Sequence, residues 1–114
     1  MSGSAAQYNI TINKNADFKR SFQIKESGSI LNITSYAFAG KLKENLQKAD
    51  STAVAFTCSI TDAGAGTFSI ELTDTQTASM DPGSWRYDVV MTDTGSKKTR
   101  LLEGVADVRE GVTA

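Results

Sequence analysis

The sequence predicts an all-β protein, an antiparallel sandwich or barrel of about seven or eight strands with one short helical turn. Apolar residues recur at every second position over most of the chain, which is typical of strands that bury one face. Short segments rich in Gly, Asn, Asp and Ser separate these runs and indicate turns between the strands. No long helical period lies between the strands, so a parallel βαβ architecture is not predicted.

Seven segments carry the two-residue alternation. In the first of them, Tyr8, Ile10 and Ile12 alternate with polar residues and are expected to face one side. The segment with the heaviest aromatic face begins at Trp85, and a shorter apolar segment at 30–34 leads into the third strand. In chain order, the expected strands are 8–12, 18–24, 36–42, 54–60, 68–72, 85–91 and 97–108.

Two positions depart from this alternation. Arg20 has the apolar parity of its strand, and we interpret it as a rim residue with a packed stem and a solvated head, or as the mark of a bulge. In the last strand the apolar parity slips around Glu103 and Gly104. We therefore expect a β-bulge at Gly104.

The stretch 73–80 breaks the alternation and predicts one helical turn. Thr73 and Gln76 have the three-residue spacing of a capping box, in which each side chain bonds to the backbone of the other residue. Pro82 follows in a turn where its fixed backbone angle is favourable. Residues 45–51 are polar and without a sustained period, so we expect a hairpin loop there.

Length and composition predict a single domain. The chain has 114 residues, of which 39% are hydrophobic and 22% charged. We expect the domain to span 8–110, between flexible ends at 1–7 and 111–114. The balance of 12 Lys and Arg against 13 Asp and Glu argues against a nucleic-acid binder. Because no apolar stretch approaches the roughly 18 residues of a membrane helix, we expect no membrane partner.

The inventory of reactive side chains is small. The chain has no His and a single Cys, Cys58, which excludes His-dependent catalytic triads, His metal sites, multi-cysteine metal sites and an intrachain disulfide. Cys58 shares the apolar parity of its strand, so we interpret it as a core residue. We expect a protein that is not an enzyme and that uses no cofactor and no metal.

Acidic residues gather at the turns, at Asp62, Asp74, Asp81 and Asp93. Turn carboxylates commonly accept hydrogen bonds from nearby backbone N–H groups, and we interpret these four in that way. Their spacing lacks the dense run of oxygen ligands that a calcium loop needs. A hydrolase with two carboxylates that the fold brings together stays open as an alternative.

Four residues are candidates for an interface, namely Trp85, Lys97, Lys98 and Arg100. The alternation of Trp85 and Tyr87 with further apolar residues indicates a core face, whereas an exposed Trp85 would offer a platform for a sugar or a docking partner. The three basic residues lie beside a hairpin. They form either a solvated strand face or a site for an anionic partner.

Several strand-and-turn phrases follow one another in a distinctive order. The first motif is an extended strand. The second is a D-L-T-G-Y turn that leads into another strand, and Ser35 stands in place of its Gly. The third is close to G-x-F-x-I-x-L-T-x-x-x-T, and the ending is close to G-x-Y-x-Y-D-V … R-x-L-x-G-x-x-x-V, with Trp85 at its first Tyr. The phrases occupy 18–24, 32–42, 68–77, 83–90 and 99–108. This order resembles the small tailed-phage virion domains typified by the N-terminal domain of the baseplate upper protein.

The resemblance spans 8–113 and implies an immunoglobulin-like β-sandwich that attaches or scaffolds other parts of a phage tail or baseplate, without catalytic residues. The family's domain usually precedes receptor-binding modules, and none follows Ala114, so we expect a connector, adaptor or decoration role. The implied partners are other virion proteins and further copies of the chain. The implied location is the tail or neck of the virion, after synthesis in the bacterial cytoplasm. The alternatives are a stand-alone carbohydrate-binding or adhesin module and a capsid decoration protein.

Overall fold

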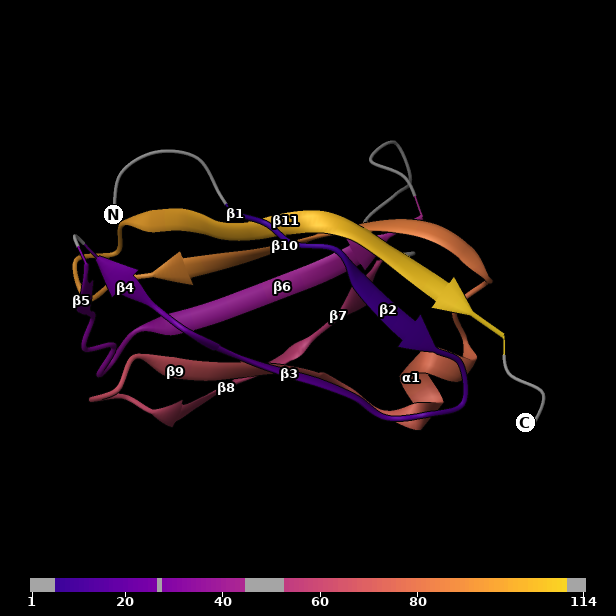
Figure 1. The fold of residues 1–114 in the computed structure, drawn as a ribbon, viewed down its shortest axis with the longest axis horizontal. Coiled ribbons are helices and arrows are strands. Elements are labelled where there is room, and N and C mark those ends of the chain that lie inside the picture. Colours follow the sequence, from indigo (N-terminus) through magenta and orange to yellow (C-terminus); the bar gives the residue numbers. More distant parts are fainter. Residues whose placement is uncertain (1–5, 27, 45–52, 111–114) are drawn as a thin grey trace.

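Two layers of β-strands face each other in the computed structural model of the chain, and the helix lies at one end of them (Figure 1). The structure describes residues 6–26, 28–44 and 53–110. Within these residues the all-β class is confirmed, with eleven strands, four of them only two residues long, and one five-residue helix. The elements are β1 (Ala6–Gln7), β2 (Ile10–Asn13), β3 (Phe18–Gln23), β4 (Lys25–Glu26), β5 (Ser29–Ile30), β6 (Ala37–Lys43), β7 (Val54–Ala55), β8 (Thr57–Asp62), β9 (Thr67–Leu72), α1 (Asp74–Ala78), β10 (Gly83–Thr92) and β11 (Lys98–Arg109).

The larger sheet has the order β1-β11-β10-β6-β7, and β2 also pairs with β11. Its centre is an antiparallel ladder that runs from Gly83 opposite Val108 to Thr92 opposite Lys98. The expectation of antiparallel pairing is wrong for the N-terminal strands, because β1 and β2 both run parallel to β11. Parallel neighbours require a long connection, and here most of the chain lies between them.

The smaller sheet is antiparallel and has the order β3-β9-β8. The segment expected as one strand at 54–60 divides between the two sheets, because the chain crosses from one layer to the other at Phe56. The Phe56 N–H donates to the Gly40 carbonyl at 2.9 Å, which anchors the crossing to the larger sheet. Strands β4 and β5 form a separate small hairpin.

Most of the alternating apolar residues lie between the two sheets, as expected, but Ile60 of β8 is 37% exposed. Phe68, Ile70 and Leu72 of β9 belong to one buried cluster with Tyr87 and Val89 of β10, and none of these side chains is more than 4% exposed. Burying a side chain of this size contributes about 1.5–3 kcal/mol relative to leaving it in water. The cluster therefore supplies the main attraction that holds the two layers together.

The N-terminal boundary differs from the expected one. Ala6 and Gln7 form β1, so the flexible segment expected at 1–7 is wrong for these two residues. Tyr8 lies between β1 and β2, where its N–H donates to the Glu103 carbonyl at 3.0 Å and its side chain is 41% exposed. The expected loop at 45–51 and the expected flexible end at 111–114 lie outside the described residues.

The capping box and the helical turn are confirmed. The Gln76 N–H donates to Thr73 Oγ1 at 3.2 Å, and the Thr73 N–H donates to Gln76 Oε1 at 3.0 Å. The helix is also fixed to the connection between β2 and β3, because the buried Thr77 hydroxyl donates to the Ala16 carbonyl at 2.9 Å. In addition, the Gln76 amide donates to the Ala55 carbonyl at 3.0 Å.

The bulge in β11 lies at Leu101 and not at the expected Gly104. Val89 pairs with Leu102, and the next residue, Val90, pairs with Arg100, so Leu101 is the extra residue. A bulge lets two neighbours share one face of a strand. Leu101 and Leu102 accordingly are both buried, with 4% and 9% of their surface exposed.

Gly104 has a different role, which is to let the N-terminal segment approach β11. A β-carbon at this position would lie 2.9 Å from the carbonyl carbon of Tyr8 and would clash with its oxygen. The same oxygen accepts a hydrogen bond from the Tyr87 hydroxyl. Gly104 thus allows β10, β11 and the segment between β1 and β2 to meet at one carbonyl group.

We expect Gly104→Ala to destabilise the protein by about 1–3 kcal/mol, because the added methyl group must push the Tyr8 backbone away from β11. Gly95→Ala is the matched control, since a β-carbon at Gly95 meets only Asp93 Oδ1 at 3.5 Å. That control should change the free energy of unfolding by no more than about 0.5 kcal/mol. Urea unfolding of both variants measures the difference, and equal stabilities would contradict the close approach at Gly104.

Candidate functional site

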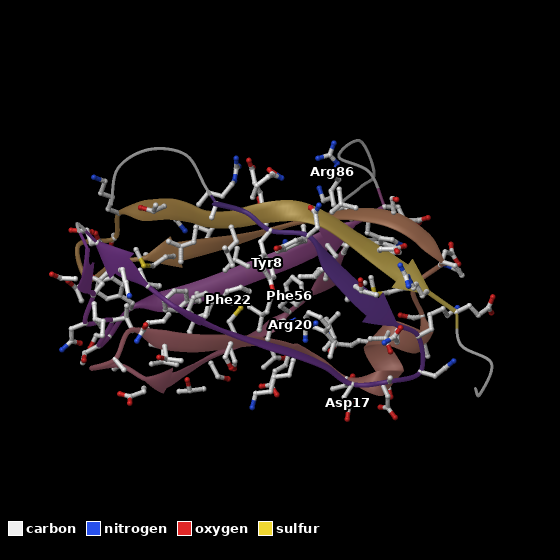
Figure 2. The ribbon with its side chains drawn as sticks, viewed as in Figure 1. Tyr8, Asp17, Arg20, Phe22, Phe56 and Arg86 are labelled. Carbon is white, nitrogen blue, oxygen red and sulfur yellow. The ribbon has the colours of Figure 1, made fainter. Side chains whose placement is uncertain are left out.

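A pocket of about 460 Å³ opens on the outer face of the larger sheet, which is the face turned away from the core. Residues of β1, β11, β10 and β6 line it, and six of the nine lining side chains are charged. Figure 2 shows Arg86 on this outer side, whereas Phe22 and Phe56 lie between the layers. The lining residues are Gln7, Lys41, Lys43, Arg86, Tyr87, Asp88, Arg100, Glu103 and Gly104.

Strand register places the charges of three strands side by side. Asp88 of β10 stands between Glu103 of β11 and Lys41 of β6. Two residues earlier on β10, Arg86 stands opposite Lys43 of β6. Side chains directly opposite each other in a sheet have β-carbons about 4.5–5.5 Å apart, so these residues form one compact cluster.

Arg100 connects the two carboxylates of the pocket. Its Nε lies 3.3 Å from Asp88 Oδ2, and its Nη1 lies 3.8 Å from Glu103 Oε1. In a regular strand, residues three positions apart point to opposite faces. The bulge at Leu101 removes this opposition and places Arg100 and Glu103 on the same outer face.

The pocket has an excess of positive charge. Its lining holds four basic residues and two acidic ones, and both carboxylates are within ion-pair distance of Arg100. Within the described residues, neither Lys41 nor Arg86 has a carboxylate oxygen within ion-pair distance. The pocket can therefore accept an acidic side chain or another anionic group at its β6 side.

Tyr87 lies beneath the pocket and joins it to the core. Its hydroxyl donates to the Tyr8 carbonyl, and its ring packs edge-on against Phe56 with ring centroids 5.9 Å apart. Burial raises the pKa of Tyr87 from 10.0 to about 12, and nearby Tyr8 adds to the shift. Tyr87 is therefore a protonated hydrogen-bond donor at neutral pH and contributes no charge to the pocket.

In the pocket the structure brings together a carboxylate pair, Asp88 and Glu103, of the kind that the hydrolase alternative requires. Arg100 contacts an oxygen of each of them, so both carboxylates already serve as ion-pair acceptors. Within the described residues no group of three or more Cys, Asp or Glu side chains is arranged to hold a metal ion.

The four expected interface residues do not form one surface. Trp85 is only 5% exposed, and its indole N–H donates to the Asp81 carbonyl at 2.9 Å, so its candidacy for an interface is wrong. Tyr87 is 4% exposed, and neither ring can stack on a sugar. Lys97 and Lys98 are exposed at the hairpin between β10 and β11, and only Arg100 lines the pocket.

Cys58 and three of the four turn aspartates have contacts of the kind that the sequence predicted for them. Cys58 is half-buried and packs against the core, and burial raises the pKa of its thiol more than a hydrogen bond with the Gly40 backbone lowers it. Asp62 and Asp93 accept backbone hydrogen bonds within their turns, from Ala65 at 3.2 Å and from Gly95 at 2.9 Å. Asp74 accepts one from Thr75 at 2.8 Å, at the start of α1.

Sequence reasoning missed Lys41, Lys43, Arg86, Asp88 and Glu103 as members of one site. The signal for them was present, because Arg86 and Asp88 occupy the polar parity of an otherwise apolar strand. The alternation along a strand shows which face of the sheet a residue occupies, but it does not show which residues of the adjacent strands lie beside it. The pairing of β10 with β6 and β11 was needed to join these residues.

The chain matches no known family model, and no curated protein matches its sequence. In the described part of the chain, no helical segment has the length and apolar character needed to cross a membrane.

We expect Tyr87→Phe to destabilise the protein by about 1 kcal/mol at neutral pH, because the Tyr8 carbonyl loses its donor. The pKa of Tyr87 in the folded state lies above its ordinary value of 10.0. The protonated hydroxyl therefore stabilises the folded state fully below pH 10.0, and this stabilisation is lost as the pH rises through about 12. The stability gap between wild type and variant should narrow over that range. Urea unfolding at several alkaline pH values tests this, and a constant gap would contradict a raised pKa.

Proposed function

We propose that the chain is a structural module of a tailed-phage virion, an immunoglobulin-like β-sandwich of the tail, baseplate or neck that acts by binding neighbouring proteins. The turn before β6 is the main support for this proposal, because residue 35 has the left-handed backbone conformation that the Gly of the D-L-T-G-Y motif favours. Ser35 has φ 65°, in the left-handed region that favours glycine, and it stands where the resembled family often has Gly.

The side chains of the same turn also support the resemblance. Asn32 Oδ1 accepts hydrogen bonds from the Thr34 N–H at 3.0 Å and from the Thr34 hydroxyl at 2.6 Å. An aspartate at this position, as in the family's phrase, has the same acceptor oxygen. The Tyr36 N–H then closes the turn by donating to the Ile33 carbonyl at 3.1 Å.

The strand order supports the immunoglobulin-like arrangement. That fold places the second, fifth and fourth strands of the series in one sheet, and the third, sixth and seventh in the other. If β3 is taken as the second strand of the series, then β3-β9-β8 forms the first of these sheets and β6, β10 and β11 lie together in the second. Strand β2 pairs in parallel with β11 on the side away from β10, and so borders this sheet.

The pocket on the larger sheet supplies the docking face in this proposal. A neighbouring virion protein would present an acidic surface to Lys41 and Arg86, whose side chains are exposed and have no carboxylate partner among the described residues. Charge complementarity of this kind speeds association and selects the partner. The ladder between β10 and β11 holds the pocket rigid, so binding requires little ordering.

Mass spectrometry of purified particles tests the virion assignment. We expect the chain to co-purify with intact particles through a density gradient and to fractionate with tails after the particles are disrupted. Recovery with the capsid shell would favour the decoration alternative. Absence of the chain from particles, while it is present in the lysate, would overturn the proposal.

We expect Arg86→Glu to lower incorporation into particles by about fivefold, because an exposed ion pair contributes up to about 1 kcal/mol. Lys97→Glu is the matched control, since it makes the same charge change at an exposed site outside the pocket. Tagged wild-type and variant chains are supplied during particle assembly, and the tag per particle is measured by immunoblot. Equal losses for both variants would show that net charge, and not the pocket, determines incorporation.

A further inference from the structure

Strand β3 has an open edge. Among the described strands it pairs only with β9, so it forms one border of the smaller sheet. The side chains of Lys19, Ser21 and Gln23 are all exposed along it. An open edge of this length carries a row of backbone donors and acceptors that another strand can use.

The register identifies the backbone groups that point outward. The Ile24 N–H donates to Gly66, the residue directly opposite in the continued register of β3 and β9, at 2.8 Å. Directly opposed residues of an antiparallel pair alternate between bonded and non-bonded, so Phe22, Arg20 and Phe18 also bond to β9. The N–H and C=O groups of Lys19, Ser21 and Gln23 therefore point to the open side.

Arg20 covers part of this edge. Its Nη1 donates to the Lys19 carbonyl at 3.1 Å, and its guanidinium carbon lies 5.3 Å from the centroid of the Phe18 ring. Arg20 is exposed although it has the inward parity of the strand. Beside it, Tyr8 packs edge-on against Phe22 with ring centroids 5.4 Å apart, and Figure 2 shows these residues together between the two layers.

We propose that β3 is a self-association edge, at which a second copy of this chain adds its own β3 in antiparallel orientation about a two-fold axis at Ser21. The two three-stranded sheets then form one continuous sheet of six strands. This inference rests on the proposed function for its biological setting, because it names one contact by which copies of the module would assemble.

The sequence of β3 is complementary to itself in this register. Lys19 stands opposite Gln23 of the second copy, and the outward-pointing backbone groups of the two residues exchange hydrogen bonds. Ser21 stands opposite its own copy, so no like charges oppose each other along the edge. A two-fold contact requires this self-complementarity, because each residue meets its partner twice.

Arg20 also contributes to the contact between the two copies. Arg20 stands opposite Phe22 of the second copy, and a guanidinium stacks favourably on an aromatic face. When Arg20 leaves the Lys19 carbonyl, that oxygen becomes available to the Gln23 N–H of the second copy. The exposed ring of Tyr8 lies beside Phe22 and would be covered in the same step.

The other edges are less suited to such pairing. Strand β7, at the end of the larger sheet, has only two residues. Strand β8, at the far end of the smaller sheet, lies against β6, and its Cys58 bonds to the backbone of Gly40. Strand β3 has the same length as β8, and among the described strands it packs closely only on β9.

Sedimentation velocity over a concentration series tests the proposal on the purified chain. We expect the wild type to dimerise and Ser21→Pro to weaken the dimer at least tenfold, because proline removes an outward N–H. Ser21→Ala is the matched control and should leave the dimer within about twofold, since it keeps that N–H. Circular dichroism checks that each variant is folded. A wild type that stays monomeric at its highest soluble concentration overturns the proposal, as does equal dimerisation of the two variants.

A charge pair tests the register even if Ser21→Pro fails to fold. Gln23→Lys places two lysines opposite each other at both ends of the contact and should weaken the dimer several-fold at low salt. Adding Lys19→Glu to that variant should restore it, because the introduced carboxylate would then oppose the introduced ammonium group of the second copy. Absence of restoration refutes the antiparallel register at Ser21. A monomeric chain that still co-purifies with virions overturns this inference alone, whereas a dimer absent from virions overturns only the proposed function.

Discussion

The antiparallel ladder between β10 and β11 is the constraint on which the larger sheet, one side of the core and the pocket depend. It aligns the inward residues of β10 with the core and the outward residues with the pocket. It also offers its two borders to other strands, β6 on one side and the parallel β1 and β2 on the other. The larger sheet, the buried cluster and the candidate docking face all depend on this one register.

The bulge at Leu101 links this ladder to the chemistry of the pocket. One extra residue lets Leu101 and Leu102 both enter the core, and the same extra residue brings Arg100 to the face that carries Glu103. Arg100 then contacts both carboxylates, whereas Lys41 and Arg86 have no carboxylate oxygen within ion-pair distance among the described residues. A local irregularity of the backbone therefore adds one positive charge to the pocket and joins its two carboxylates through Arg100.

The two candidate surfaces of the molecule differ in physical character. The pocket is a charged face built on paired strands, where selectivity would come from complementary charge. The β3 edge offers backbone groups, where affinity would come from hydrogen bonds between strands. A module that carries both could bind one neighbour through its sheet face and a copy of itself through its edge.

The amino-acid sequence by itself determined the all-β class, the apolar parity of the main strands, the capping box at Thr73 and Gln76, and the turn roles of several aspartates. These features depend on residues close together in the chain, and their spacing is visible without a partner. Tertiary structure alone decided the parallel pairing of β1 and β2, the crossing between sheets at Phe56, the burial of Trp85, and the bulge at Leu101 instead of Gly104. It also assembled Lys41, Arg86 and Asp88 with Arg100, because lateral neighbours in a sheet are set by register between distant segments, which the alternation within one strand does not encode.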